Sequence, residues 1–443
     1  MLLALLLTPL TLHDVQDRAR HNDPRAQQAV AQVESAQGKK SEADWSWFPN
    51  FSTTAYVAGP TPEHRLNGGD LDPHPADPGD LTPGSSAPGI LHGQLGAVLH
   101  VDVQALLPLW TFGKLTAGKD AGAHYVKVNQ ALLQRARDQA AFDAARAFWG
   151  YQTARDADAA VQKIRDRLGD AQKTAAQLLS EKSNQIGKSD ALKLDYLAEE
   201  IEAQHAKAVK NRDLAITALR LLIGLKPEEP LEIVQQSLPD APAAPNADEV
   251  LRRALDHRPE TRAAREGVAA RLSLVDLARA RLYPDVGLAF GVRFTDTTNA
   301  DNPSDPFINN PYHESSAYVA LGLQGTFDIP QKLARLHQAE ADLHEAMALQ
   351  AGADSLVRLE VQQALGDLTE AGQRWQRYVK QAQIGRQLAT QASVAFDSGL
   401  GEARELLEDT ILFARADGER LSALFDAQVA WAALEKASGG PLQ

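Results

Sequence analysis

The tripeptide Gly187-Lys188-Ser189 is the part of the sequence that most resembles a catalytic motif, because Gly-Lys-Ser ends the phosphate-binding loop of many nucleotide-hydrolysing proteins. That loop also needs a glycine five positions before Gly187, and this position is occupied by Lys182. It needs a preceding β-strand as well, whereas the residues before this segment have a helical pattern. We therefore interpret the segment as a turn, in which Gly187 reverses the chain between two long helices.

Histidine and aspartate side chains offer a second kind of chemistry, metal binding. His64, His74 and His92 share one loop with several aspartates, but their spacing matches no recognised metal site. The segment Asp296 to Asp305 lacks the fixed ligand positions and the closing glutamate of a calcium-binding loop. The sequence therefore predicts no metal site.

Composition narrows the class of protein further. The chain has 443 residues, of which 44% are hydrophobic and 23% are charged, as in an ordinary folded protein. It contains no cysteine, which excludes disulfides, thiolate metal sites and cysteine nucleophiles. The formal net charge of −13 argues against nucleic acid as a partner. Because no serine, histidine and acid arrangement and no glycine-rich nucleotide loop is found either, we expect neither an enzyme nor a bound cofactor.

The first residues, "MLLALLLTPLTL", contain a short apolar run. This run resembles the central region of a secretory signal, although it has no basic start and no small-residue cleavage site. Residues 1–9 are therefore interpreted as a signal-peptide remnant, with a buried first helical turn as the alternative.

The sequence repeats itself at a distance of 235 positions. The two similar segments are residues 15–51 and 250–286. Their gapless alignment pairs Pro24 with Pro259 and Pro49 with Pro284. We therefore expect two structural repeats. The expected repeats are residues 10–237 and 247–440, joined by a proline-rich linker at 238–246.

Each repeat has two segments in which apolar residues alternate with small or polar ones, as in Val286, Leu288 and Phe290 against Gly287 and Ala289. This alternation predicts strands with one apolar face. The expected strands are residues 48–58, 94–107, 285–295 and 316–329, and the expected loops within the two pairs are residues 59–93 and 296–315. A strand that crosses a membrane needs only about 9 to 11 such residues.

Very long helices occupy most of the remaining chain. The expected helices are residues 12–47, 113–184, 188–226, 247–282, 331–397 and 402–438. At 1.5 Å rise per residue the helix over 113–184 would be a rod of about 100 Å, so it needs partners along its whole length. Small residues such as Ala140 and Ala144 would allow close helix packing in an antiparallel coiled coil.

Four strands in one chain are too few to close a barrel, and unpaired strand edges are not tolerated inside a bilayer. If the strands lie in a membrane, several chains must pool them. The strands therefore predict an oligomer, without specifying the number of chains.

The ordered set of these features resembles the TolC-like outer-membrane efflux proteins. The segment "LTLHDVQDRARHNDPRAQQAVAQVESA" is similar to the N-terminal helix of the family, "WFPNF" and "LYPDV" to its helix-to-strand junctions, and "LPLWTFGKL" to its return from strand to helix. The C-terminal segment that begins "FDSGLGEARELLEDT" resembles the helix that leaves the inner tip of the channel. The resemblance covers the chain from about Leu10 to Gly440.

The resemblance implies an α+β fold that is mostly α, with two repeats of long antiparallel helices that form an α-barrel tunnel in the periplasm. It implies that each repeat contributes two strands to a transmembrane β-barrel shared by a homotrimer in outer-membrane lipid, with helix-strand junctions at Pro49, Gly113 and Pro284. The implied function is passive export through this channel, which is the outer part of a tripartite efflux or type I secretion system. The implied partners are a periplasmic adaptor protein and an inner-membrane transporter.

The resemblance also implies functional residues at two helix-hairpin tips and at a gate. The tip residues expected to contact the adaptor are Ile186, Gly187, Lys188, Ser398, Gly399, Leu400 and Gly401. The first tip has Lys188 where the family favours an apolar residue, which puts its contact with the adaptor in doubt. After the second tip the family has two aspartates at a periplasmic gate, and Glu405 and Glu408 occupy these positions here. Their i, i+3 spacing places them on one helix face.

The sequence leaves two alternatives open for the function and one for the gate residues. A soluble periplasmic coiled-coil scaffold with small β caps would have the same helices without needing strands suited to lipid. Within the family, a paralogue that has lost adaptor binding would also explain Lys188. An exposed, solvated helix face is the simpler interpretation of Glu405 and Glu408.

Overall fold

The computed structural model describes residues 9–61, 96–181, 187–298, 300, 302, 310–398 and 400–442. Residues 1–8, most of the expected loop 59–93 with its three histidines, and the tip residues Ile186 and Gly399 lie outside these ranges. The chain divides into two compact units. The first unit comprises 1–37, 124–269 and 344–443, and the second comprises 38–123 and 270–343.

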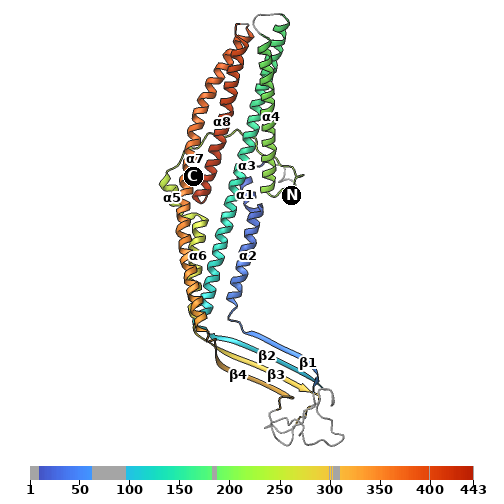
Figure 1. Ribbon diagram of the computed structural model, residues 1–443, viewed down its shortest axis with the longest axis vertical. Coiled ribbons are helices and arrows are strands. Elements are labelled where there is room, and N and C mark those ends of the chain that lie inside the picture. Colours follow the sequence, from blue (N-terminus) through green and yellow to red (C-terminus); the bar gives the residue numbers. More distant parts are fainter. Residues whose placement is uncertain are drawn as a thin grey trace. The chain divides into compact units, whose positions relative to one another are not determined.

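Helices make up most of the described chain (Figure 1). They are α1 (Leu12–Asn22), α2 (Pro24–Asp44), α3 (Lys114–Ser180), α4 (Lys188–Leu222), α5 (Ala247–His257), α6 (Pro259–Ala280), α7 (Ile329–Asp397) and α8 (Ala403–Ser438). The two longest, α3 and α7, have 67 and 69 residues. The expected mostly helical α+β class is confirmed. No helix in the described ranges is both long enough and apolar enough to cross a membrane.

The expectation of single helices over 12–47 and 247–282 is wrong, because each of these segments forms two helices. The breaks fall at Asp23 and Arg258, whose ψ angles of 130° and 135° are not helical. Pro24 and Pro259 follow, and a proline ring clashes with a helical conformation of the residue before it. Proline suits the first position of a helix, so α2 and α6 start there.

The core of the first unit consists of three clusters of buried apolar side chains. Phe148 on α3, Leu194 on α4 and Leu434 on α8 are representative, with at most 1% of their surface exposed. The alanines expected to allow close helix packing, such as Ala140 and Ala144, are fully buried. The small side chains of α3 therefore lie at its contacts with neighbouring helices.

The second unit contains one antiparallel sheet with the strand order β1-β2-β3-β4 (Figure 1). Its strands are β1 (Asn50–Thr61), β2 (Gly96–Trp110), β3 (Asp285–Thr297) and β4 (Glu314–Gln324). The last strand ends five residues before the expected limit at 329, and α7 begins at Ile329. Pro330 suits the first turn of a helix and cannot donate a hydrogen bond to a strand, so the chain leaves the sheet before it. The central pair, β2 and β3, joins the two repeats.

Candidate functional site

The register of the sheet places apolar side chains from all four strands on one face. Phe51, Ala105, Phe290 and Val319 lie opposite one another across the sheet, and residues at such opposite positions share a face. We call this the apolar face. It contains Phe51, Val57, Leu99, Val101, Val103, Leu107, Val286, Leu288, Phe290, Val292, Phe294, Val319, Leu321 and Leu323. The side chains of Leu321 and Leu323 are 69% and 73% exposed, so the chain by itself leaves much of this face uncovered.

The opposite side, which we call the polar face, has interacting charged and aromatic residues at its centre. Arg293 donates from Nε to Asp102 Oδ2 at 2.9 Å, and its Nη1 lies 3.9 Å from Glu314. His100 hydrogen-bonds Thr295 Oγ1 at 2.9 Å. The contacts of Arg293 with Asp102 and of His100 with Thr295 join residues about 190 positions apart in the sequence. Sequence reasoning did not identify them, because the alternation within one strand does not say which residue of another strand lies opposite.

Exposed aromatic side chains gather where helices meet strands in the second unit. Trp45, Trp47 and Phe48 pack together before β1, with ring centroids 6.0 to 6.3 Å apart. Phe112 stacks on Tyr283 at 5.2 Å. Such a group of half-exposed aromatics is typical of the boundary between a membrane and water.

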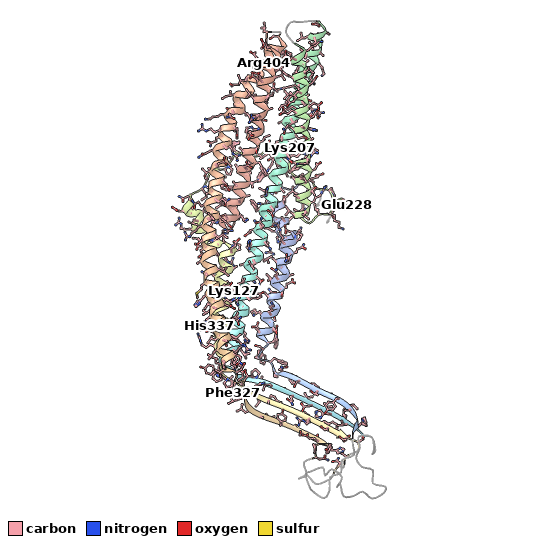
Figure 2. All side chains as sticks on the ribbon, viewed as in Figure 1. Lys127, Lys207, Glu228, Phe327, His337 and Arg404 are labelled. Carbon is pink, nitrogen blue, oxygen red and sulfur yellow. The ribbon has the colours of Figure 1, made fainter. Side chains whose placement is uncertain are left out.

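The three expected junction residues lie beside these aromatics. Pro49 immediately precedes β1 and Pro284 immediately precedes β3. Gly113 lies between β2 and α3 with a φ angle of +91°, which favours glycine. Phe327, between β4 and α7, is 92% exposed (Figure 2).

The expected gate residues lie in the first turns of α8, in the first unit, where Arg404 is labelled in Figure 2. Both Glu405 and Glu408 are exposed. Arg404 Nε donates to Glu408 Oε1 at 2.8 Å, and this bond raises the pKa of the Arg404 guanidinium above its usual range. Arg404 is not among the residues expected at the gate, although its i, i+4 spacing from Glu408 is a recognisable signal for an ion pair.

The described tip residues lie where one long helix ends and the next begins. Gly187 and Lys188 are at the start of α4, and Ser398, Leu400 and Gly401 lie between α7 and α8. Gly187 donates its N–H to Asp190 Oδ2 at 3.1 Å, and this bond lowers the pKa of the Asp190 carboxyl. At the other tip, the N–H groups of Leu400 and Gly401 both donate to Ala395 O at 2.9 Å. The side chain of Leu400 is 88% exposed.

Among the described residues, no group of three or more histidine and acidic side chains is arranged to hold a metal ion. What the geometry does supply is a two-faced sheet, an aromatic boundary and long packed helices. Residues 250–440 match the family model described as outer membrane efflux protein. The second half of the chain is therefore similar to the outer membrane efflux proteins.

Solved structures of outer-membrane channels have the same fold as this chain. The channel OprN is 19% identical, with a TM-score of 0.77, and the match covers 97% of this chain and 90% of OprN. VceC from Vibrio cholerae is 17% identical, with a TM-score of 0.74 and coverage of 97% and 96%. MtrE from Neisseria gonorrhoeae, in its open state, is 18% identical, with a TM-score of 0.74 and coverage of 97% and 89%. No curated protein matches the sequence.

Proposed function

We propose that three copies of this chain form a passive efflux channel in the outer membrane, which receives substrates from a periplasmic adaptor and an inner-membrane transporter. The observation that supports this proposal best is the sheet register, which separates an apolar face from a polar face across all four strands. The outer edges of β1 and β4 have no partner strand within the described chain. Backbone groups at such edges must be paired inside a bilayer, so β1 of one copy pairs with β4 of the next.

Pairing between three copies closes the sheet into the shared barrel, with the apolar face toward lipid and the polar face toward water. The aromatic groups around Trp45 and Tyr283 then lie at the periplasmic surface of the membrane. The packed helices continue the channel into the periplasm. Such a channel conducts without a chemical step of its own, so the energy for export comes from the transporter.

The gate is assigned to Glu405 and Glu408. Three copies would surround the channel axis with six carboxylates, and such rings favour cations. Arg404 modifies this proposal, because its ion pair with Glu408 offsets part of the negative charge. The tip residues Leu400 and Lys188 would contact the adaptor, and the exposed apolar side chain of Leu400 suits burial in a protein interface.

Conductance in a planar bilayer tests the channel and its gate together. The full chain, purified from outer membranes, is compared with Glu405→Ala/Glu408→Ala and with a control, Glu199→Ala/Glu228→Ala, which removes the same charge elsewhere. We expect small cation-selective steps that become larger in the gate variant and stay unchanged in the control. Unchanged steps in the gate variant would reject the gate assignment, and a chain that gives no steps would reject the channel.

A further inference from the structure

A cavity of about 570 Å³ lies in the second unit between α6, the end of β4 and the start of α7. These segments lie side by side in Figure 1. The ion pair between Arg271 of α6 and Asp342 of α7 joins two of them, with Nη1 3.0 Å from Oδ2.

The lining of this cavity is positively charged, although the whole chain has a formal net charge of −13. Its cationic side chains are Lys114, Arg271, Arg281, Lys332 and Arg335, and its carboxylates are Asp285 and Asp342. Cationic groups gathered in a concave site are the usual means of binding an oxyanion. The cavity is therefore suited to an anionic ligand.

The carboxylates around the cavity neutralise only part of this charge. Lys114 Nζ lies 2.8 Å from Asp285 Oδ1, and Asp342 pairs with Arg271. Lys332 and Arg335 share one carboxylate, that of Asp328, each at 3.7 Å. Counting these three carboxylates against the five cations leaves an excess of two positive charges.

Arg281 and Lys332 are the two cations best placed to attract a ligand. Arg281 is exposed, and its guanidinium has no carboxylate within ion-pair distance among residues 9–61, 96–181, 187–298 and 310–398. Lys332 is only 8% exposed, and its Nζ donates to the Thr326 carbonyl at 2.6 Å. A largely desolvated ammonium group interacts more strongly with an anion than one surrounded by water.

The first repeat lacks two of the corresponding charges, those of Arg271 and Arg281. At the distance of 235 positions, Ala36 corresponds to Arg271 and Ser46 to Arg281. A junction between helix and strand therefore forms in the first repeat without these arginines. Their presence in the second repeat is not a requirement of the fold, which favours a role in binding.

One wall of the cavity is apolar and consists of Leu274, Leu277 and Ala278 of α6, with Tyr283 beside them. A ligand that fits both walls has an anionic head and an apolar part. We propose that this cavity binds a phosphate-type oxyanion, held by Arg281, Lys332 and Arg335, with the apolar wall available to an apolar part of the same ligand. The ligand is either a membrane phospholipid or a water-borne phosphate compound, because both present the same oxyanion.

Calorimetric titration of the full chain in a neutral maltoside detergent tests this proposal. The probes are inorganic phosphate, a short-chain phosphatidylglycerol and, as a zwitterionic comparison, a short-chain phosphatidylcholine. We expect the anionic lipid or inorganic phosphate to bind, and Arg281→Gln/Arg335→Gln to weaken that binding about tenfold or more. Binding of phosphatidylglycerol alone would identify a lipid headgroup, and binding of inorganic phosphate would identify a water-borne oxyanion.

The matched control is Arg262→Gln/Arg279→Gln, which removes two arginines of α6 that do not line the cavity and should leave the affinity unchanged. Arg281→Gln alone serves if the double variant fails to fold, because this exposed side chain takes part in no ion pair in the described chain. Absence of binding by the unaltered chain, or equal affinity in the cavity variants, would overturn the proposal.

Discussion

Asp23 and Arg258 occupy the same position in the two repeats and have opposite charges. They lie 235 residues apart, and each is only 2% exposed. Arg25, two residues after Asp23, donates from Nη2 to Asp23 Oδ2 at 2.8 Å. In the second repeat Glu260, two residues after Arg258, accepts from Nη2 at 3.2 Å.

The neighbouring long helix completes each of these ion-pair clusters. Arg25 reaches Asp143 of α3 at 2.7 Å, and Arg258 bonds Glu360 of α7. In both repeats one arginine therefore contacts two carboxylates, one near the helix break and one on the long helix. The first repeat has the acid at the break and the arginine two residues later, whereas the second repeat has the arginine at the break and the acid two residues later.

This exchange predicts that the first cluster tolerates reversal of its charges. Asp23→Arg alone should lower the free energy of unfolding by about 3 kcal/mol, because it breaks the ion pair and places a buried cation beside Arg25. Asp23→Arg/Arg25→Glu should recover most of that loss, since the new arginine can reach Asp143 as Arg258 reaches Glu360. Thermal unfolding in detergent measures both variants, and equal losses would contradict the equivalence of the two clusters.

The same cluster predicts a loss of stability in acid. Burial alone would raise the pKa of the Asp23 carboxyl, but hydrogen bonds from the Arg25 side chain and backbone outweigh it, and the pKa lies below its usual range. An acid with a depressed pKa in the folded state stabilises the fold above its unfolded pKa, about 3.9 for aspartate, and this contribution is lost as the pH falls through the folded value. Asp23→Asn should therefore be less stable at pH 7, and the difference should shrink below about pH 4. A difference in stability that does not change with pH would exclude the depressed pKa of Asp23 as its cause.

The close contact between Gly291 and Tyr318 predicts that no side chain fits at position 291 on the polar face. A Cβ added there would lie 2.2 Å from the Tyr318 ring, so Gly291→Ala must displace the ring, at a cost of about 1 to 2 kcal/mol. Gly322 is on the same face and has no atom within 4 Å of such a Cβ, which makes Gly322→Ala the matched control. We expect the midpoint of thermal unfolding to fall in Gly291→Ala only, and Tyr318→Ser in that background to restore it.

The ion pair between Arg293 and Asp102 predicts the ion selectivity of the proposed channel. If the polar face lines the channel, Arg293→Gln removes a positive charge from each copy and should raise the ratio of cation to anion permeability by roughly twofold. Asp102→Asn should lower it. Ser316→Ala changes no charge on the same face and should have no effect on the reversal potential in a salt gradient. Identical reversal potentials for all variants would place this face away from the ion path.

Much of the second unit could be predicted from local patterns. The alternation of Val286, Leu288 and Phe290 indicates a two-faced strand, because successive side chains of a strand point to opposite faces. The helix breaks have a local cause as well, because Pro24 and Pro259 disfavour a helical conformation of the residue before each of them, whereas the repeat pattern alone predicts one helix in each segment.

The sequence by itself determined the long helices, the two faces of each strand, the repeat and the resemblance to outer-membrane efflux proteins. Only the tertiary structure decided that β2 pairs with β3, that Arg293 lies opposite Asp102, and that Arg281 and Lys332 line one cavity. The physical reason is the range of the interactions involved. Helix formation and strand alternation depend on residues a few positions apart, whereas strand register and the cavity depend on contacts between segments that are distant in the chain.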